Sequence, residues 1–166
     1  MATFEIEKRD FRETLARVAS MGGADLVLTS PPYDSARTYG AEVSFGVSDY
    51  RELGDAVMGA LRPGGQALVN LSGPVRDTER GTERSLTPWR VALDWAERVG
   101  LRLHDVLAYG RMGVPGAYVG RYRQDWEPVL WFSRPGGEVF FDKEPLAEDA
   151  ASGPYQKAAG SRRADG

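Results

Sequence analysis

Three stretches of the chain carry apolar residues at the spacing of an amphipathic helix, between a capping residue and a glycine or proline that ends the helix. The first has Phe11 and Leu15 on its apolar side and Glu13 placed as in a capping box. The capping residues that precede these helices are Asp10, Ser48 and Thr87, and the residues that end them are Gly22, Pro63 and Gly100.

Short apolar runs alternate with these helices. Residues 25–29 and 66–71 are nearly continuous apolar runs, which are typical of strands buried on both faces of a parallel sheet. Weaker patterns predict strands at 3–7, 101–109 and 126–133, and the polar stretch 72–85 is predicted to be a loop. This order predicts an α/β fold, with helices on both faces of a mixed, mainly parallel sheet.

Length and composition limit the classes of protein to consider. A chain of 166 residues makes one domain, which we place at 1–146, and the small, polar and charged tail 147–166 is expected to be disordered. There is no cysteine and only one histidine, so disulfides, thiol nucleophiles and histidine-rich metal sites are not expected. The net charge of −3 argues against binding nucleic acid through bulk positive charge. With no membrane span or signal peptide in the sequence, we expect a cytoplasmic protein.

The most informative segment is Ser30-Pro31-Pro32-Tyr33, directly after the strand at 25–29. Neither proline has an N–H group, so the segment cannot extend a sheet, and both φ angles are fixed, so the carbonyl groups point in set directions. In open α/β sheets the active crevice lies beyond the carboxyl ends of the strands, which is where this segment falls. The structural alternative is a rigid turn in which Tyr33 only packs.

The run Asp-Leu-Val-Leu-Thr-Ser-Pro-Pro-Tyr at 25–33 resembles the catalytic motif of amino-group DNA methyltransferases, and its Thr-Ser-Pro-Pro-Tyr form is most similar to the cytosine-N4 branch. The resemblance extends over about residues 8–134. It includes Arg-Thr-Tyr-Gly at 37–40, Leu-Arg-Pro-Gly-Gly at 61–65 and Trp-Glu-Pro-Val-Leu-Trp-Phe at 126–132. It implies a Rossmann-like, S-adenosylmethionine-dependent enzyme that methylates double-stranded DNA, as in restriction–modification systems.

The resemblance also implies roles for particular residues. Ser30, Pro31, Pro32 and Tyr33 would be catalytic: the Ser30 hydroxyl and the Pro31 carbonyl can accept hydrogen bonds from the target amino group, and Tyr33 can stack on a base flipped out of the duplex. Asp10 and Thr29 would lie at the cofactor. Asp10 is also expected to cap the first helix, and the two roles are not exclusive. The arginines expected to meet DNA are Arg37, Arg111, Arg121 and Arg123.

One element of the resemblance is missing. These enzymes hold the cofactor on a glycine-rich turn between a strand and a helix, and no glycine pair in this sequence has that context. In a circularly permuted branch of the family the catalytic half comes first, so the chain resembles a catalytic half whose cofactor half is truncated or encoded on another polypeptide. We therefore expect the edge of the strand at 25–29 to pair with a complementing polypeptide or with a second copy.

Two alternatives within this framework and one outside it stay open. The target could be adenine N6 instead of cytosine N4. The chain could be an inactive remnant that binds DNA or a partner. A methyltransferase acting on a protein glutamine also has two prolines and a tyrosine in its motif, but usually has Asn before them and the glycine-rich turn upstream.

Overall fold

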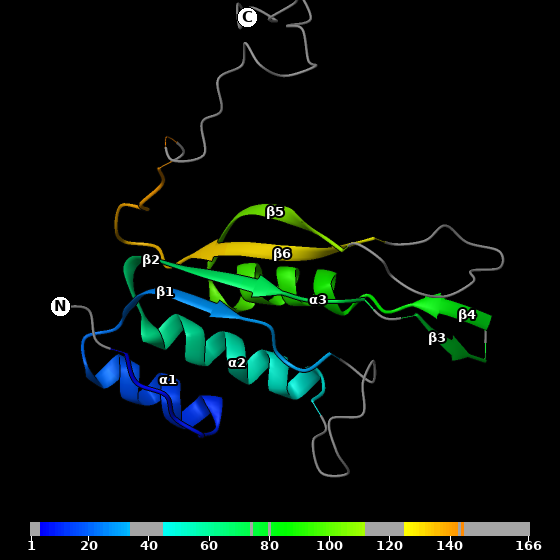
Figure 1. The fold of residues 1–166 in the computed structure, drawn as a ribbon, viewed down its shortest axis with the longest axis horizontal. Helices are drawn as coiled ribbons and strands as arrows, with labels where there is room; N and C mark the ends of the chain where they lie inside the picture. The colour runs from blue at the N-terminus through cyan, green and yellow to red at the C-terminus, as the bar shows by residue number, and fades with distance from the viewer. Residues whose placement is uncertain are drawn as a thin grey trace, which may run out of the picture.

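The computed structural model describes residues 4–33, 45–73, 75–79, 81–111, 125–142 and 144. A four-stranded sheet in the order β1-β2-β6-β5 forms the centre of the fold (Figure 1). Its strands are β1 (Ala24–Thr29), β2 (Leu61–Asn70), β5 (Arg102–Gly110) and β6 (Trp126–Ser133). The helices are α1 (Phe11–Ser20), α2 (Val47–Ala60) and α3 (Thr87–Asp94), which continues into the π-helical turn η1 (Trp95–Val99). A separate hairpin consists of β3 (Val75–Thr78) and β4 (Gly81–Arg84).

The α/β class and the mixed sheet are confirmed, but the sheet is not mainly parallel. Among the strands of the described residues, β1 and β2 pair in parallel, whereas β6 is antiparallel to both β2 and β5. The apolar run of β6 resembles that of a parallel strand because β6 is a central strand. Its direction depends on the connection from β5, for which the sequence predicts no crossover helix.

The core lies on one face of the sheet. Alternate residues of the two central strands are fully buried there, and α1, α2 and α3 with η1 pack on one another over the same face. The residues with an exposed fraction of 0% include Val57, Val69, Trp95, Leu130 and Phe132. The prediction of helices on both faces is therefore wrong for the described part of the chain, because residue patterns show that a helix has an apolar side but not which face of the sheet it covers.

The opposite face of the sheet carries a lateral row of apolar side chains that no described helix covers. Leu28 is paired with Leu68, which is paired in turn with Trp131, so these three side chains lie side by side on that face. Leu28 is 71% exposed. Trp131 is partly covered by two other rings. The ring of His104 stacks on it with the ring centroids 5.1 Å apart, and the ring centroid of Phe141 lies 5.5 Å from that of Trp131.

Several local predictions are confirmed and others are wrong. The side chain of Asp10 caps α1 by accepting a hydrogen bond from the Arg12 N–H at 2.8 Å. No strand forms at residues 4–7, where Phe4 and Ile6 are both 88% exposed. The predicted loop at 72–85 contains the β3–β4 hairpin, and the tail at 147–166 lies outside the described residues.

The Pro63-Gly64-Gly65 segment does not end a helix as predicted. Helix α2 already ends at Ala60, and the three residues lie inside β2. Gly64 has a φ of +80°, and a side chain there would collide with the backbone at Glu138. The glycine therefore serves the close approach of the segment that follows β6, a long-range contact that the local sequence does not reveal.

Candidate active site

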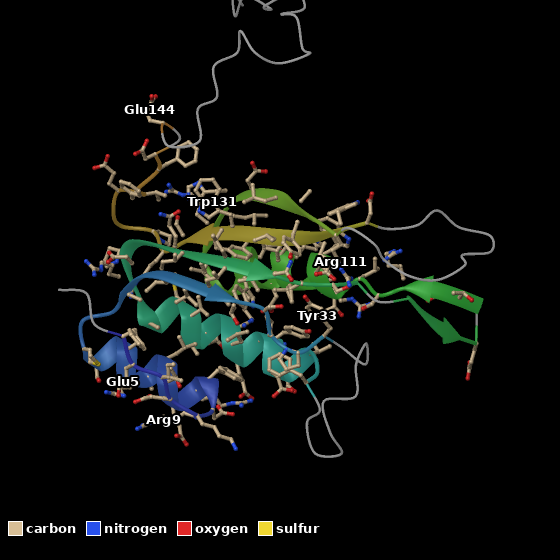
Figure 2. All side chains as sticks on the ribbon, in the orientation of Figure 1. Glu5, Arg9, Tyr33, Arg111, Trp131 and Glu144 are labelled. Carbon is tan, nitrogen blue, oxygen red and sulfur yellow. The ribbon has the colours of Figure 1, made fainter. Side chains whose placement is uncertain are left out.

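Residues at the ends of all four strands form one cluster of polar side chains. The cluster lies at the end of the sheet where β1, β2 and β5 finish and β6 begins. Ser30 and Tyr33 follow the carboxyl end of β1, and Asn70 is the last residue of β2. Because β6 runs the opposite way, its second residue, Glu127, lies at the same end, and Arg111 follows β5 there. Figure 2 shows Tyr33 and Arg111 at this end of the sheet. The predicted position of the Ser-Pro-Pro-Tyr segment, at the carboxyl end of a strand, is confirmed. The prediction that this strand is buried on both faces is wrong for the described part of the chain, because β1 pairs with a described strand on one side only and Leu26 and Leu28 are exposed.

The Tyr33 hydroxyl is at the centre of the cluster. It donates to Asn70 Oδ1 at 2.6 Å and lies 3.2 Å from Glu127 Oε2. The Ser30 hydroxyl is 3.1 Å from the Tyr33 hydroxyl and 3.4 Å from Asn70 Oδ1. These contacts fix the direction of the tyrosine ring from its far end, so the ring is presented in one orientation.

Glu127 is a buried carboxylate with a charged partner. It is 6% exposed, and its Oε1 accepts a hydrogen bond from Arg111 Nη1 at 2.8 Å. In the structure the Arg111 guanidinium pairs with this buried acid beside the tyrosine. The role that the sequence predicts for Arg111, at DNA phosphates, stays a prediction. At 39% exposure the Arg111 side chain still reaches the surface.

Asn70 and Glu127 are functional candidates that sequence reasoning misses. Each is a polar residue next to a run of apolar residues, Ala67–Val69 in β2 and Pro128–Phe132 in β6, which is a signal that could have marked them. The side-chain nitrogen Asn70 Nδ2 is buried, and within the part of the chain that the structure describes it has no hydrogen-bond partner. A buried donor without a partner is uncommon in a folded protein and often marks a functional position.

The proline segment is anchored from the helical side. The hydroxyl of Tyr50 on α2 donates to the carbonyl oxygen of Pro32 at 2.7 Å. Pro31 is buried, and its carbonyl oxygen accepts no hydrogen bond from any of the described residues. The site thus offers the Ser30 hydroxyl and the Pro31 carbonyl as two acceptors close together in the chain, which suits a ligand with two N–H donors.

Asp10 has no contact with this cluster among the described residues. Its carboxylate caps α1 and also binds the guanidinium of Arg12, which in addition meets Asp49 and Glu52. The hydrogen bonds that Arg12 donates to Glu52 and then to Asp49 raise the pKa of Arg12. The backbone N–H of Gly46 is the main cause that lowers the pKa of Asp49. The predicted helix cap at Asp10 is thus confirmed, and its role at the cofactor stays a prediction.

The remaining predicted residues fall into two groups. Thr29 is the last residue of β1 and is half-buried. Arg37, Arg121 and Arg123 lie outside the described residues. Within the described ranges, no group of three or more potential metal-ligating side chains comes together, and no helix is long and apolar enough to cross a membrane.

Comparisons with known proteins identify the fold. No protein-family model matches the sequence, and the comparison with curated proteins gives no match. A protein from Thermus thermophilus, named as a DNA modification methylase and solved with S-adenosyl-L-methionine, matches with a TM-score of 0.58 at 18% identity. The match covers 81% of this chain and 57% of that one.

Two further structures agree with this match. The selenomethionine derivative of the same Thermus protein matches with a TM-score of 0.54 at 22% identity, over 81% of this chain and 56% of that one. The M1.HpyAVI–SAM complex matches with a TM-score of 0.50 at 19% identity, over 86% of this chain and 60% of that one. The chain therefore has the α/β fold of S-adenosylmethionine-dependent methyltransferases and spans somewhat more than half the length of the structures that it matches.

Proposed function

We propose that this chain is the catalytic half of a permuted amino-group DNA methyltransferase, with cytosine N4 as the favoured target and S-adenosylmethionine as the methyl donor. The observation that carries the proposal is the Ser-Pro-Pro-Tyr segment at the end of β1, held in a polar cluster on a methyltransferase fold. We further propose that it acts on double-stranded DNA, in the cytoplasm and as part of a restriction–modification system.

The residues of the cluster suit the chemistry of an exocyclic amine. Such an amine is a weak nucleophile because its lone pair is delocalised into the ring. Acceptance of its two N–H groups by the Ser30 hydroxyl and the Pro31 carbonyl would localise the lone pair and aim it. The ring of Tyr33, fixed by its hydroxyl, would cover one face of the flipped base. S-adenosylmethionine, when bound, supplies an electrophilic methyl group.

The residues of this chain fit the part of such a site that binds the base. Few of them could contact the cofactor. Asp10 and Thr29 are the two residues assigned to the cofactor, and Asp10 is already engaged as a cap and in an ion pair. No glycine-rich turn follows a strand and opens a helix in the described part of the chain. We therefore assign the main cofactor contacts to a complementing unit, on another polypeptide or on a longer chain.

The edge of β1 supports this assignment. β1 pairs on one side only with a described strand, and its residues Leu26 and Leu28 are 54% and 71% exposed. Edge strands of folded proteins are usually protected by charges, prolines or bulges. On β1 these features stand only at its start, where the pairing with β2 is irregular between Ala24 and Leu26 and Asp25 pairs with Arg62 at 2.8 Å. The unpaired side of β1 suits the addition of a strand. The apolar row of Leu28, Leu68 and Trp131, which no described helix covers, suits the addition of a helix.

The test is to co-express this chain with a cofactor half of the family and to measure methyl transfer to DNA. Each half alone is the control, and mass spectrometry of the nucleosides separates N4-methylcytosine from N6-methyladenine. We expect activity from the mixture only, with N4-methylcytosine as the product. If the mixture is inactive while this chain alone is a folded monomer with a covered β1 edge, the split-enzyme proposal fails. The alternative of an inactive remnant would then replace it.

A further inference from the structure

The Ser-Pro-Pro-Tyr segment lacks the usual means of fixing a backbone. Strand β1 ends at Thr29, and neither Pro31 nor Pro32 has an N–H group with which to continue the ladder. The direction of these carbonyl groups therefore depends on contacts made by the carbonyls themselves and by Tyr33. The structure has such a contact at the second proline, where the Tyr50 hydroxyl donates to the Pro32 carbonyl at 2.7 Å.

Tyr50 is itself held firmly by the core. It is 4% exposed, and its ring packs edge-to-face on Phe45 with the ring centroids 4.8 Å apart. Its backbone carbonyl accepts a hydrogen bond from the indole Nε1 of Trp95 at 2.9 Å, and Trp95 is fully buried. The hydroxyl of Tyr50 is therefore a fixed point relative to the helices and the sheet.

The covalent geometry carries this restraint to the neighbouring carbonyl. The ring of Pro32 locks its φ, and the Pro31 carbonyl is bonded to the nitrogen of that ring. With φ locked, ψ of Pro32 is the one soft torsion between the two peptide planes, so holding the Pro32 carbonyl limits how far the Pro31 carbonyl can turn. We propose that Tyr50 is a positioning residue that aims the Pro31 carbonyl at the target amine. The role in catalysis rests on the proposed function, whereas the restraint on the backbone does not.

The first test uses the chain alone and the substitution Tyr50→Phe, which keeps the ring and removes one hydroxyl. The N–H group of Tyr33 lies in the same peptide plane as the Pro32 carbonyl, so its NMR order parameter reports the restraint directly. We expect a fall from the value of a rigid backbone, about 0.85, towards the flexible range below about 0.6. Tyr109→Phe is the matched control: Tyr109 is 57% exposed, and its hydroxyl has no hydrogen-bond partner in the described residues. An unchanged order parameter in Tyr50→Phe would overturn the proposal.

The second test measures methyl transfer by the complemented enzyme. Loss of one hydrogen bond that orients a reacting group should lower kcat by about three- to tenfold and leave KM for DNA and for the cofactor within about twofold. A raised KM with an unchanged kcat would assign Tyr50 to binding and overturn its positioning role. If the wild-type complex does not methylate DNA, the proposed function and the role in catalysis fail together. The order parameter still decides whether Tyr50 fixes the backbone.

Discussion

Replacing Tyr33 by Phe and by Ala separates the two contributions of its side chain. Tyr33→Phe removes only the hydroxyl, which is 2.6 Å from Asn70 Oδ1 and 3.2 Å from Glu127 Oε2. Glu127 keeps its ion pair with Arg111, but among the described residues Asn70 Oδ1 keeps only the longer 3.4 Å contact with Ser30. An acceptor that loses its partner in a buried site costs about 1–3 kcal/mol. Because Tyr33 is only half-buried, water can replace part of this bond, and we expect the free energy of unfolding to fall by about 1 kcal/mol.

The effect on methyl transfer should separate the two variants further. Tyr33→Phe keeps the aromatic ring, so it keeps the stacking energy of about 1–3 kcal/mol per base and loses only part of the activity. Tyr33→Ala removes the ring, and the rate of methyl transfer should fall by about 10- to 100-fold. Urea unfolding of the chain alone measures the first effect, and methylation of DNA by the complemented enzyme measures the second.

Two results would contradict this reasoning, each in a different way. If Tyr33→Ala methylates DNA at the wild-type rate, Tyr33 does not cover the base, and its side chain only packs. If Tyr33→Phe unfolds at the same urea concentration as the wild type, the hydroxyl does not contribute to a hydrogen-bonded cluster in solution. Tyr109→Phe, at an exposed tyrosine on β5, controls for the removal of a hydroxyl as such.

Three further predictions concern the core, the surface charges and the cofactor. In Gly54→Ala the new Cβ would lie 2.5 Å from the buried indole Nε1 of Trp95. The overpacking should lower the free energy of unfolding by about 1–3 kcal/mol, more than the gain in helix propensity returns. Gly59→Ala, which has open space around it, should leave the free energy of unfolding unchanged or raise it by up to about 1 kcal/mol in the same urea assay. The hydrogen bond from Arg98 lowers the pKa of Asp94 in the folded chain, so its contribution to stability is present above the usual aspartate value of 3.8 and is lost as the pH falls through the lowered value. Urea midpoints at about pH 5 and about pH 3 should therefore differ less in Asp94→Asn than in the wild type. Calorimetric titration of the chain alone with S-adenosylmethionine should show no binding at micromolar concentrations, and tight binding would contradict the assignment of the cofactor contacts to a complementing unit.

The parts of the fold that could be predicted from the sequence are those that depend on neighbouring residues. The cap at Asp10, the position of β1 and the bounds of β6 follow from side chains within a few positions of one another. The face covered by the helices could not be predicted in this way, because it depends on how strands far apart in the chain are ordered. Gly64 illustrates the same limit, since the contact that requires a glycine there comes from Glu138.

The candidate site likewise contains residues that the local sequence reveals and residues that only the strand pairing brings together. Ser30 and Tyr33 are adjacent to a strand and stand out as a motif, so the sequence locates them. Asn70 and Glu127 are 37 and 94 positions from Tyr33, and only the pairing of β2 between β1 and β6 brings them to its hydroxyl. Each of them has an ordinary local interpretation, as the polar end of a strand and as a charge at a strand start.

The order of the strands also explains why the motif needs support from both sides. A segment with two prolines is rigid within itself, but neither proline has an N–H group with which to orient it relative to the sheet. Tyr50 supplies that orientation from the helical layer, and Asn70 with Glu127 supplies it from the neighbouring strands. All of these anchors belong to the described part of this chain, whereas the uncovered edge and face of β1 lie towards the unit that we expect to bring the cofactor. On the proposed function, the base-binding side would form before that unit docks, and docking would then have only to bring the methyl donor to a site already in place.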